Sequence, residues 1–420
     1  MPRYTGMYIG GLILALGDIY LWSAFRKRVF SYNRVLKILL IFIFWLPLMT
    51  LAAAVVASDI VPIVEWNDVF RNYLFGSIIV IFTAKILPIL FLLLADIARV
   101  IERFFHLSKK QKRRDINREH EGITRSKFLQ YLGFLSGGLV MGSMFVGMFK
   151  WVFEFKVYRE KIPVPNLPKS FNGLKIIQIS DFHLGNWGLT KPMDEAIETI
   201  MNLKPDLIVF TGDLVTFSTR EAYRFEEQLK KLKAPMGVYA TLGNHDYGLY
   251  VSWPDDAAKQ KNMTDLYDFY DRIGWKLLNN ENVIFKQGED KLALVGVENW
   301  GANKRFPRYG DIDKALNGAE TVPVKILLSH DPSHWDSVIV PGNYPINLTL
   351  SGHTHGFQFG IESKKIKWSP AQYVYKHWAG LYKNPMSSRF LYVNRGIGSI
   401  GYPGRIGILP EITLIELLKV

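Results

Sequence analysis

Apolar residues are distributed very differently in the first third of the chain and in the rest of it. A bilayer span takes about 20 apolar residues in a helix that rises about 1.5 Å per residue. Four stretches meet this requirement, at residues 7–25, 36–57, 73–94 and 128–149. The pattern predicts an α-helical transmembrane region of about four spans over residues 1–149 and a globular domain over residues 150–420.

Beyond residue 173 the pattern becomes that of an α/β protein, in which short β-branched runs alternate with amphipathic stretches. Three prolines, Pro163, Pro165 and Pro168, mark an extended lead into this region. Helices are predicted at residues 192–202, 221–232 and 264–273. Strands are predicted at residues 174–180, 207–211, 237–241, 292–297, 324–329, 346–350, 391–394 and 412–417.

Two charged residues, Asp18 and Lys85, fall inside predicted spans. Charges at that depth are costly, so they either pair inside the helix bundle, extend toward the interface, or serve transport. Interior packing is the preferred interpretation, and transport stays open.

The charges between the spans predict the topology, because Lys and Arg near span ends are retained in the cytoplasm. The first connection carries five basic residues, whereas the second carries Asp59, Glu65 and Asp68 against Arg71. The third connection is again basic, which places the globular domain outside the cytoplasm. The basic residues of the first connection are Arg26, Lys27, Arg28, Arg34 and Lys37, and those of the third are Lys109, Lys110, Lys112, Arg113, Arg114, Arg118, Arg125 and Lys127.

The segment before the fourth span, residues 124–130, also resembles a twin-arginine export signal that lacks its second arginine. A degenerate signal and a chance match both remain open. Either interpretation sends the following domain across the membrane.

Charge and cysteine content narrow the classes of function. The chain has a formal net charge of +13, and residues 1–149 hold 18 basic and 9 acidic residues, or +9 of that total. The excess therefore belongs to the membrane third, and no nucleic-acid binding is expected. Cysteine is absent. This excludes disulfides, cysteine nucleophiles and thiolate ligands, so any metal must be bound by oxygen and nitrogen.

Polar clusters follow most of the predicted strands at their carboxyl ends, the edge at which open α/β sheets place their sites. Each cluster alone is typical of a turn or a cap, yet five of the nine histidines fall into these clusters. The clusters are Asp181-Phe182-His183, Gly212-Asp213, Gly243-Asn244-His245-Asp246, His330 and Gly352-His353-Thr354-His355.

The candidate ligands in these clusters are carboxylates, an amide and imidazoles, which suit Mn, Fe or Zn. Seven groups are too many for one ion and fit two ions that share a bridging carboxylate. The candidates are Asp181, His183, Asp213, Asn244, His330, His353 and His355.

The order D-x-H, G-D, G-N-H-D, H, G-H-x-H resembles the signature of the calcineurin-like metallophosphoesterase superfamily over residues 158–420. The chain is most similar to its membrane-associated bacterial branch. The resemblance implies a β-sandwich flanked by helices. One departure concerns the pocket floor: the branch often has two glycines and a glutamine after the last histidine, and this chain has Gly356-Phe357-Gln358.

The resemblance also implies a role for each residue. Asp181, His183 and His355 would bind one divalent metal ion, Asn244, His330 and His353 the other, and Asp213 would bridge them. Such a pair supplies a nucleophile and stabilises phosphoryl charge.

Two further residues of the signature, His245 and Asp246, would be catalytic without binding metal. His245 would donate to a phosphate or leaving oxygen, and Asp246 would hold its tautomer. His334 is a weaker ligand candidate than His330, which precedes Asp331-Pro332 as in the family.

Other side chains near the clusters have two interpretations each. Arg395 either clamps a phosphate or is an ordinary surface arginine. A set of aromatic residues near the clusters either contacts substrate or packs in the core or at the surface near the membrane. They are Trp187, Trp253, Trp300, Trp335 and Tyr402.

The sequence therefore predicts a multi-pass protein, of the bacterial cell membrane by its resemblance, with an extracytoplasmic domain that hydrolyses phosphomonoesters or phosphodiesters with two metal ions. Its partners would be a phosphate-ester substrate and the lipid bilayer. One alternative is a pyrophosphatase acting on a lipid-linked or nucleotide-linked diphosphate. Another is a transporter or sensor that uses Asp18 and Lys85, with a globular part that only binds ligand.

Overall fold

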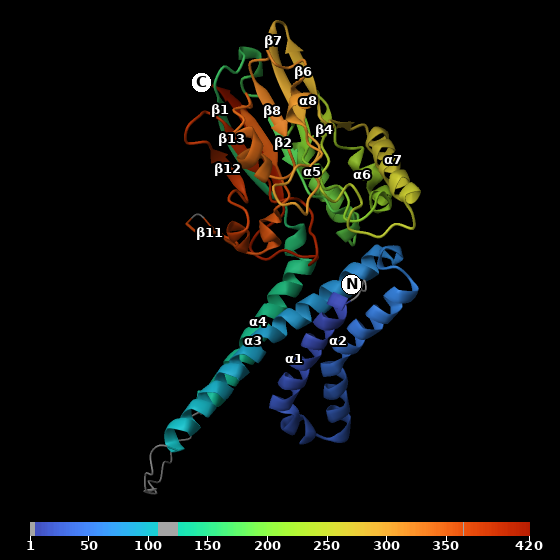
Figure 1. Cartoon of the computed structure of the whole chain (residues 1–420), viewed down its shortest axis with the longest axis vertical. Helices are drawn as coiled ribbons and strands as arrows, with labels where there is room; N and C mark the ends of the chain where they lie inside the picture. Colours follow the sequence, from blue (N-terminus) through green and yellow to red (C-terminus); the bar gives the residue numbers. More distant parts are fainter. Residues whose placement is uncertain (1–4, 108–124, 364) are drawn as a thin grey trace. The chain divides into compact units, whose positions relative to one another are not determined.

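The computed structural model describes residues 5–107, 125–363 and 365–420 of the chain, and these fall into two compact units (Figure 1). The membrane unit comprises Met1–Trp66 and Tyr73–Val146. The globular unit comprises Asn67–Asn72 and Gly147–Val420. The six residues Asn67–Asn72 therefore fold with the globular unit, although they lie between two predicted spans.

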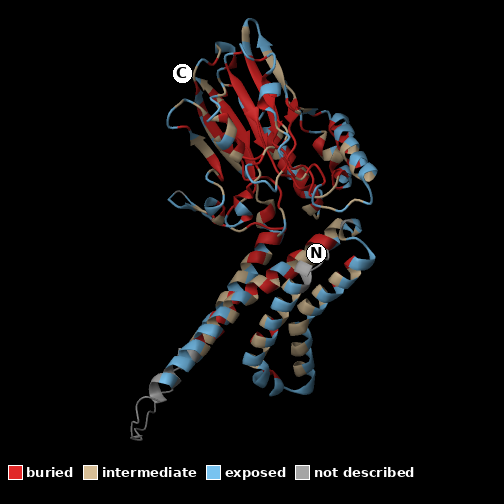
Figure 2. Ribbon diagram, in the orientation of Figure 1, coloured by how far each residue is buried: buried red, intermediate tan, exposed pale blue. Residues whose placement is uncertain are grey.

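Each predicted span lies within one long helix of the membrane unit. The helices are α1 (Thr5–Phe30), α2 (Arg34–Ile60), α3 (Asp68–Leu107) and α4 (Arg125–Phe149). All four are long and apolar enough to cross a membrane, and they expose large apolar side chains along much of their length (Figure 2). That exposure is what a lipid-facing surface requires. The basic residues of the third connection from Lys109 to Arg118 lie outside the described residues.

The two charged residues of the spans pair with each other inside the membrane unit. Lys85 Nζ donates to both carboxylate oxygens of Asp18, at 2.8 and 3.0 Å. The same ammonium group lies 4.9 Å from the ring centre of Phe44 and 4.8 Å from that of Phe82. Pairing and ring contacts offset the cost of burying charge between helices.

Two six-stranded sheets form the globular unit. The first has the order β1-β14-β2-β3-β4-β5 and the second β12-β13-β9-β8-β7-β6. A separate hairpin pairs β10 (Ile361–Glu362) with β11 (Lys367–Trp368). The strands of the first sheet are β1 (Lys156–Val164), β2 (Lys175–Ile179), β3 (Leu207–Phe210), β4 (Val238–Ala240), β5 (Lys276–Leu277) and β14 (Glu411–Lys419). Those of the second are β6 (Glu281–Gln287), β7 (Asp290–Gly296), β8 (Lys325–Leu328), β9 (Leu348–Ser351), β12 (Gly380–Lys383) and β13 (Phe390–Val393).

Apolar side chains from both sheets meet in one core, which defines a β-sandwich. The strands of the sandwich are largely buried (Figure 2). Ile176 of β2 and Val209 of β3 lie in this core with Leu294 of β7 and Leu350 of β9. The opposite face of the first sheet packs on α5 (Lys191–Asn202), α6 (Glu226–Leu229) and α7 (Asp256–Ile273), and that of the second on α8 (Ile312–Leu316). The predicted β-sandwich flanked by helices, preceded by four long apolar helices, is confirmed.

The eight predicted strands correspond to the central strands β2, β3, β4, β7, β8, β9, β13 and β14. Central strands are covered on both faces, so their sequences are almost continuously apolar. One predicted helix is wrong in type. Residues 221–232 form the end of a 3-10 helix (Thr219–Phe225), the single turn α6 and a loop, because the Glu221 carboxylate accepts the Thr216 and Phe217 amides and tightens the chain there.

Candidate metal centre

The seven candidate ligands follow the carboxyl ends of five central strands. Asp181 and His183 follow β2, Asp213 follows β3 and Asn244 follows β4, all in the first sheet. In the second sheet His330 follows β8, and both His353 and His355 follow β9. Parallel neighbours end at the same edge, so the two sheets bring these side chains to one end of the sandwich.

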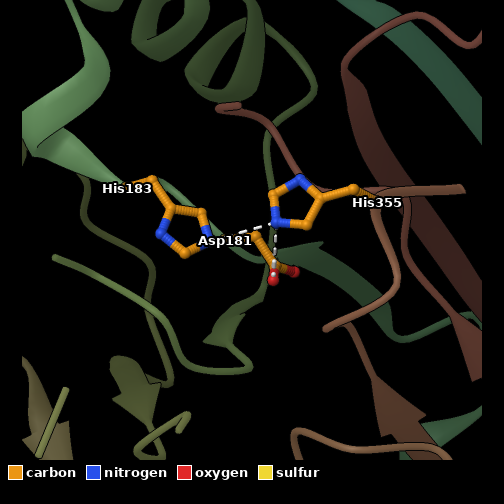
Figure 3. A group of neighbouring side chains, drawn as sticks. All are labelled: Asp181, His183 and His355. Atoms are coloured by element: carbon orange, nitrogen blue, oxygen red, sulfur yellow. Dashed lines mark hydrogen bonds and ion pairs between the residues drawn. The ribbon is translucent and has the colours of Figure 1, made fainter. Parts of the chain in front are cut away.

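Asp181, His183 and His355 form a first group, called half-site one here (Figure 3). The Nε2 atoms of His183 and His355 lie 3.0 Å apart, and His355 Nε2 lies 3.3 Å from Asp181 Oδ1. All three side chains are buried. Their ligand atoms converge on one point, as binding of a single cation requires.

Asp213, His330 and His353 form a second group, half-site two. His330 Nε2 lies 3.1 Å from Asp213 Oδ2, and His353 Nδ1 lies 3.2 Å from His330 Nε2. The same Asp213 oxygen is 3.5 Å from His183 Nε2 of half-site one. Asp213 is therefore the carboxylate that both groups share.

Two glycines of the motifs are required because another part of the chain lies too close to leave room for a side chain. A Cβ at Gly243 would clash with the Asp213 carboxylate, and one at Gly352 would clash with Ser180 Oγ and the Asp181 carboxylate. The glycine before each functional pair is therefore part of the site, because it lets the next backbone pass directly over a carboxylate.

Several candidate ligands also have a left-handed backbone. The φ angles are +54° at Asp181, +46° at His183, +61° at Asp213, +72° at His353 and +50° at His355. Non-glycine residues adopt this conformation at a cost, and such residues cluster at functional sites. Strain at five residues of one cluster supports a functional role for this end of the sandwich.

The electrostatics of the cluster favour a cation beside Asp213. Burial lowers the pKa of His183 and of His353. It also acts to lower the pKa of His330, but Asp213 outweighs it and raises that pKa to about 10. Without a metal ion, the negative charge of Asp213 thus favours a protonated His330. A divalent ion would balance the same negative charge while the imidazoles stay neutral.

Unpaired buried atoms give a second test of whether metals fit. Asn244 Oδ1 is buried and has no hydrogen-bond partner among the described residues, while the amide nitrogen of Asn244 donates to Tyr250 Oη at 2.8 Å. Leaving an acceptor buried without a partner is costly. A metal ion would satisfy this oxygen, so the residues present fit the bound ions that the ligand set implies.

His245 adjoins the shared carboxylate, with its backbone amide donating to Asp213 Oδ1 at 2.8 Å. Its ring lies 4.9 Å from that of His183 and 4.2 Å from that of Tyr250. Nδ1 is 2.8 Å from the Thr216 carbonyl oxygen. Because a carbonyl oxygen can only accept a hydrogen bond, Nδ1 carries a proton and donates it, which leaves Nε2 for other contacts.

The predicted role of Asp246 as the partner of the His245 ring is wrong. Its carboxylate accepts the amides of Asp213, Leu214, Val215 and Gly243 at 2.8 to 3.2 Å. Burial, and then Asp213, raise its pKa to about 7. Asp246 therefore positions the loop that carries Asp213, and Thr216 takes the part expected of Asp246.

The loop at Thr216 is held in turn by Glu221. Its carboxylate oxygen accepts the Thr216 amide at 2.6 Å, and its other oxygen lies 3.8 Å from Arg71 Nη2. Arg71 also pairs with Asp68 at 3.0 Å, and the Asn72 side chain donates to the Gly185 carbonyl oxygen. Segment Asn67–Asn72 thus contacts the loop that carries His183 directly and, through Glu221, the loop that carries Asp213 and Thr216.

Four other residues singled out in the sequence take structural positions. His334 is buried, its Nδ1 lies 2.9 Å from Ser329 Oγ, and it is in neither half-site. Arg395 is neither a phosphate clamp nor a surface arginine, because it is buried and pairs with Glu411 at 2.5 Å and Glu362 at 2.6 Å. Trp187 and Trp335 are buried in the core.

Other side chains that adjoin the ligands were not predicted from the sequence. Tyr375 Oη lies 3.0 Å from His353 Nε2, and the Phe306 ring centre lies 4.7 Å from that of His353. Arg405 is fully buried, with Nη2 3.4 Å from His355 Nδ1 and 2.9 Å from the carbonyl oxygens of Arg395 and Gly396. Each comes from a loop far along the chain, and no local motif marks it.

Comparison with known families agrees with this geometry. The family described as calcineurin-like phosphoesterase matches residues 174–357, and a family described as probable calcineurin-like phosphoesterase, transmembrane domain, matches residues 5–151. The chain belongs to the calcineurin-like phosphoesterases. It is a hydrolase with a transmembrane domain, of a family that uses divalent metals.

Curated relatives place the chain more closely. It is 32% identical over 259 residues to the uncharacterized metallophosphoesterase YkuE of Bacillus subtilis, covering 60% of this chain and 81% of that one. It is 30% identical over 302 residues to UDP-2,3-diacylglucosamine pyrophosphatase LpxG of Chlamydia trachomatis, covering 60% and 87%. A transmembrane protein with metallophosphoesterase domain from Danio rerio is 32% identical over 268 residues, covering 62% and 57%. The match thus spans little more than half of the Danio rerio protein.

Proposed function

We propose that the chain is a membrane-anchored hydrolase that cleaves phosphomonoesters or phosphodiesters with two divalent metal ions. The observation that carries the proposal is the arrangement of the two half-sites, which share Asp213, beside a buried Asn244 Oδ1 that has no hydrogen-bond partner in the described part of the chain. Asp181, His183 and His355 would hold one ion. Asn244, His330 and His353 would hold the other, with Asp213 between them. The ligand chemistry suits Mn, Fe or Zn.

The bound ions would supply charge stabilisation and nucleophile activation. The protein's own contribution is to orient the groups around them. The Thr216 carbonyl fixes the proton of His245 on Nδ1, so protonated His245 can present Nε2–H to a phosphate or leaving oxygen. Asp246 and Glu221 hold the two ends of the loop that carries Asp213 and Thr216.

The test uses the full-length chain in detergent with p-nitrophenyl phosphate and bis-p-nitrophenyl phosphate. Turnover that depends on Mn²⁺ and is abolished in the Asp213→Asn variant is expected. A folded protein with no turnover in any divalent metal would contradict the proposal.

A second candidate is a pyrophosphatase acting on a lipid-linked or nucleotide-linked diphosphate. The observation in its favour is the 30% identity to the UDP-2,3-diacylglucosamine pyrophosphatase LpxG over 87% of that chain. A tethered enzyme also meets membrane-borne substrates at high local concentration. Turnover of a lipid diphosphate in vesicles, at a kcat/KM well above that for soluble esters, would favour this candidate.

We further propose that the protein resides in a bacterial cell membrane with the globular unit outside the cytoplasm. Segment Asn67–Asn72 and residues 147–420 fold together, so they lie on one side of the bilayer, with the third and fourth spans crossing between them. The basic first connection assigns that side to the exterior. Alkaline phosphatase fused after Val420 should be active, whereas fluorescence from a cytoplasm-only reporter there would reverse the topology.

A further inference from the structure

An exposed apolar surface begins two residues after the metal-ligand candidate His355. Six large apolar side chains within a stretch of 18 residues are 43% to 76% exposed. They belong to the loop after β9, the β10–β11 hairpin and the following 3-10 helix (Pro370–Tyr373), which together are called the apolar flap here. The six residues are Phe357, Phe359, Ile361, Ile366, Tyr373 and Val374.

The flap is held firmly at its base, so its exposure is a property of a built structure. Gln358 donates to the carbonyl oxygens of Tyr402 and Gly404 at 2.8 and 2.9 Å and accepts the Ile400 amide at 2.6 Å. Gly360 and Ile406 complete the junction, because the Gly360 amide donates to the Ile406 carbonyl oxygen at 2.9 Å. A two-stranded hairpin is marginal by itself, and this junction supplies the missing support.

The same junction touches the end of the fourth membrane-spanning helix. Gly147 folds with the globular unit, and its carbonyl oxygen accepts the Arg405 amide at 3.2 Å. A Cβ at Gly147 would lie 2.6 Å from the Arg405 carbonyl oxygen and 2.7 Å from Tyr402 Oη. The contact is therefore closer than any side chain there would allow.

The contact attaches the junction to the end of a candidate span. Gly147 lies two residues before the end of α4 and within the candidate span Lys127–Phe153. The loop at Tyr402–Arg405, and the flap bonded to it through Gln358, are therefore joined to the segment at which the chain would leave the bilayer.

The flap also reaches the metal centre. The Phe357 ring centre lies 6.5 Å from that of Tyr375, whose hydroxyl lies 3.0 Å from His353 Nε2 of half-site two. Phe357 has φ of +53°, a conformation that glycine adopts without cost. The chain accepts strain at this position, and the side chain adds one more exposed aromatic ring to the flap.

From these observations we propose that the apolar flap inserts into the acyl and headgroup boundary of the bilayer that anchors the chain. Its large apolar side chains contact lipid tails, and the exposed Lys365 of the hairpin meets headgroup phosphates. The lipid contact does not depend on the proposed function. The further step, that the flap lets a lipid-borne phosphate reach half-site two without leaving the bilayer, rests on the proposed function.

The absence of cysteine makes a direct test practical, because one introduced cysteine is the only labelling site. Ile361→Cys and Tyr373→Cys place an environment-sensitive NBD dye on the flap, at side chains 55% and 76% exposed. Met386→Cys is the matched control. Met386 is 94% exposed in the turn before β13, which runs parallel to β9, so the control lies at the end of the sandwich opposite the ligands.

The full-length labelled proteins are reconstituted in phosphatidylcholine and phosphatidylglycerol vesicles, with nitroxide attached to either the acyl chain or the headgroup. At both flap positions the dye emission should shift to the blue, and acyl-chain nitroxide should quench it. The dye at Met386 should keep the emission of an aqueous site. Metal content and thermal unfolding are measured on each variant to show that it is folded.

The outcomes separate lipid from other occupants and from failure of the enzyme assignment. Flap dyes that behave like the dye at Met386 would overturn the proposal, as would quenching by headgroup nitroxide alone. A blue shift without quenching that grows with protein density would show a second copy of the chain in place of lipid. Because none of these readouts uses turnover, an inactive protein with quenched flap dyes would refute the proposed function and leave the lipid contact intact.

Discussion

The two half-sites are built from the same ligand types, yet they differ in their surroundings. Half-site one is enclosed, with all three ligands buried and Arg405 filling the space behind His355. Half-site two adjoins Tyr375 and Phe306 at His353, and Tyr250, which is 41% exposed, at Asn244. We infer that half-site one would hold its ion more tightly, and that half-site two would exchange its ion and face the substrate.

Loss of the shared carboxylate should abolish the difference between the half-sites. Asp213→Asn removes the negative charge that both groups use, so both ions should be lost together with nearly all activity. Metal content by mass spectrometry and turnover of p-nitrophenyl phosphate measure this. Metal content near that of the unmodified protein would count against a bridging role.

His245 tests whether chemistry can be separated from metal binding. His245→Ala should keep both ions and lose about 10² to 10⁴ in kcat, the range typical of a positioned proton donor. The backbone amide that bonds Asp213 remains in this variant. Loss of metal on this substitution would show that the role is misassigned.

Asn244 should sharpen the comparison by weakening only one half-site. Asn244→Ala removes the ligand oxygen at half-site two, and Tyr250→Phe removes the hydroxyl that orients it. Loss of such an orienting partner weakens metal binding by about 10- to 100-fold, so the alanine variant should lose at least as much. Titration with buffered Mn²⁺ should show one tight and one weakened ion, and equal weakening of both would contradict the asymmetry.

The smallest expected effect is that of Glu221, which changes the free energy of unfolding and not metal binding. Burial raises the pKa of Glu221 to about 7, against the opposing Thr216 amide and Arg71. The folded protein therefore binds this proton more tightly than the unfolded chain. Stability from this group is fully present below about pH 4.5 and declines by about 3 kcal/mol as the pH rises to about 7.

Glu221→Gln keeps an acceptor for the Thr216 amide and should flatten this decline in thermal unfolding of the detergent-solubilised protein. Glu227→Gln is the control, since Glu227 is 81% exposed. An unchanged slope in the Glu221 variant, or the same flattening in the control, would refute the assignment.

Most of the fold could be predicted because central strands are buried on both faces. The strands β1, β5, β6 and β12, which were not predicted, are the four outer strands of the two sheets. An outer strand such as β1 alternates exposed and covered positions and tolerates Pro163 near its end. Its partner β14 lies more than 240 residues away in the chain, and no local pattern encodes that pairing.

The candidate ligands could be predicted because each lies in a short motif directly after a strand. The groups around them could not. Tyr375 and Arg405 adjoin the ligands only through tertiary packing, and Thr216 acts through a backbone carbonyl, which any residue provides. Asp246 was misassigned for the same reason, because neighbours in sequence need not face each other.

Segment Asn67–Asn72 has a practical consequence for handling the protein. A fragment that begins at Gly147 would keep every candidate ligand and yet lose Arg71 and Asn72, which contact Glu221 and Gly185. Its Glu221 would lose the nearby Arg71 guanidinium, and the loops of His183 and Asp213 would lose a support. Excision by protease or by gene truncation should therefore yield a product less active than the intact chain, and adding a peptide with the sequence of this segment offers a way to restore it.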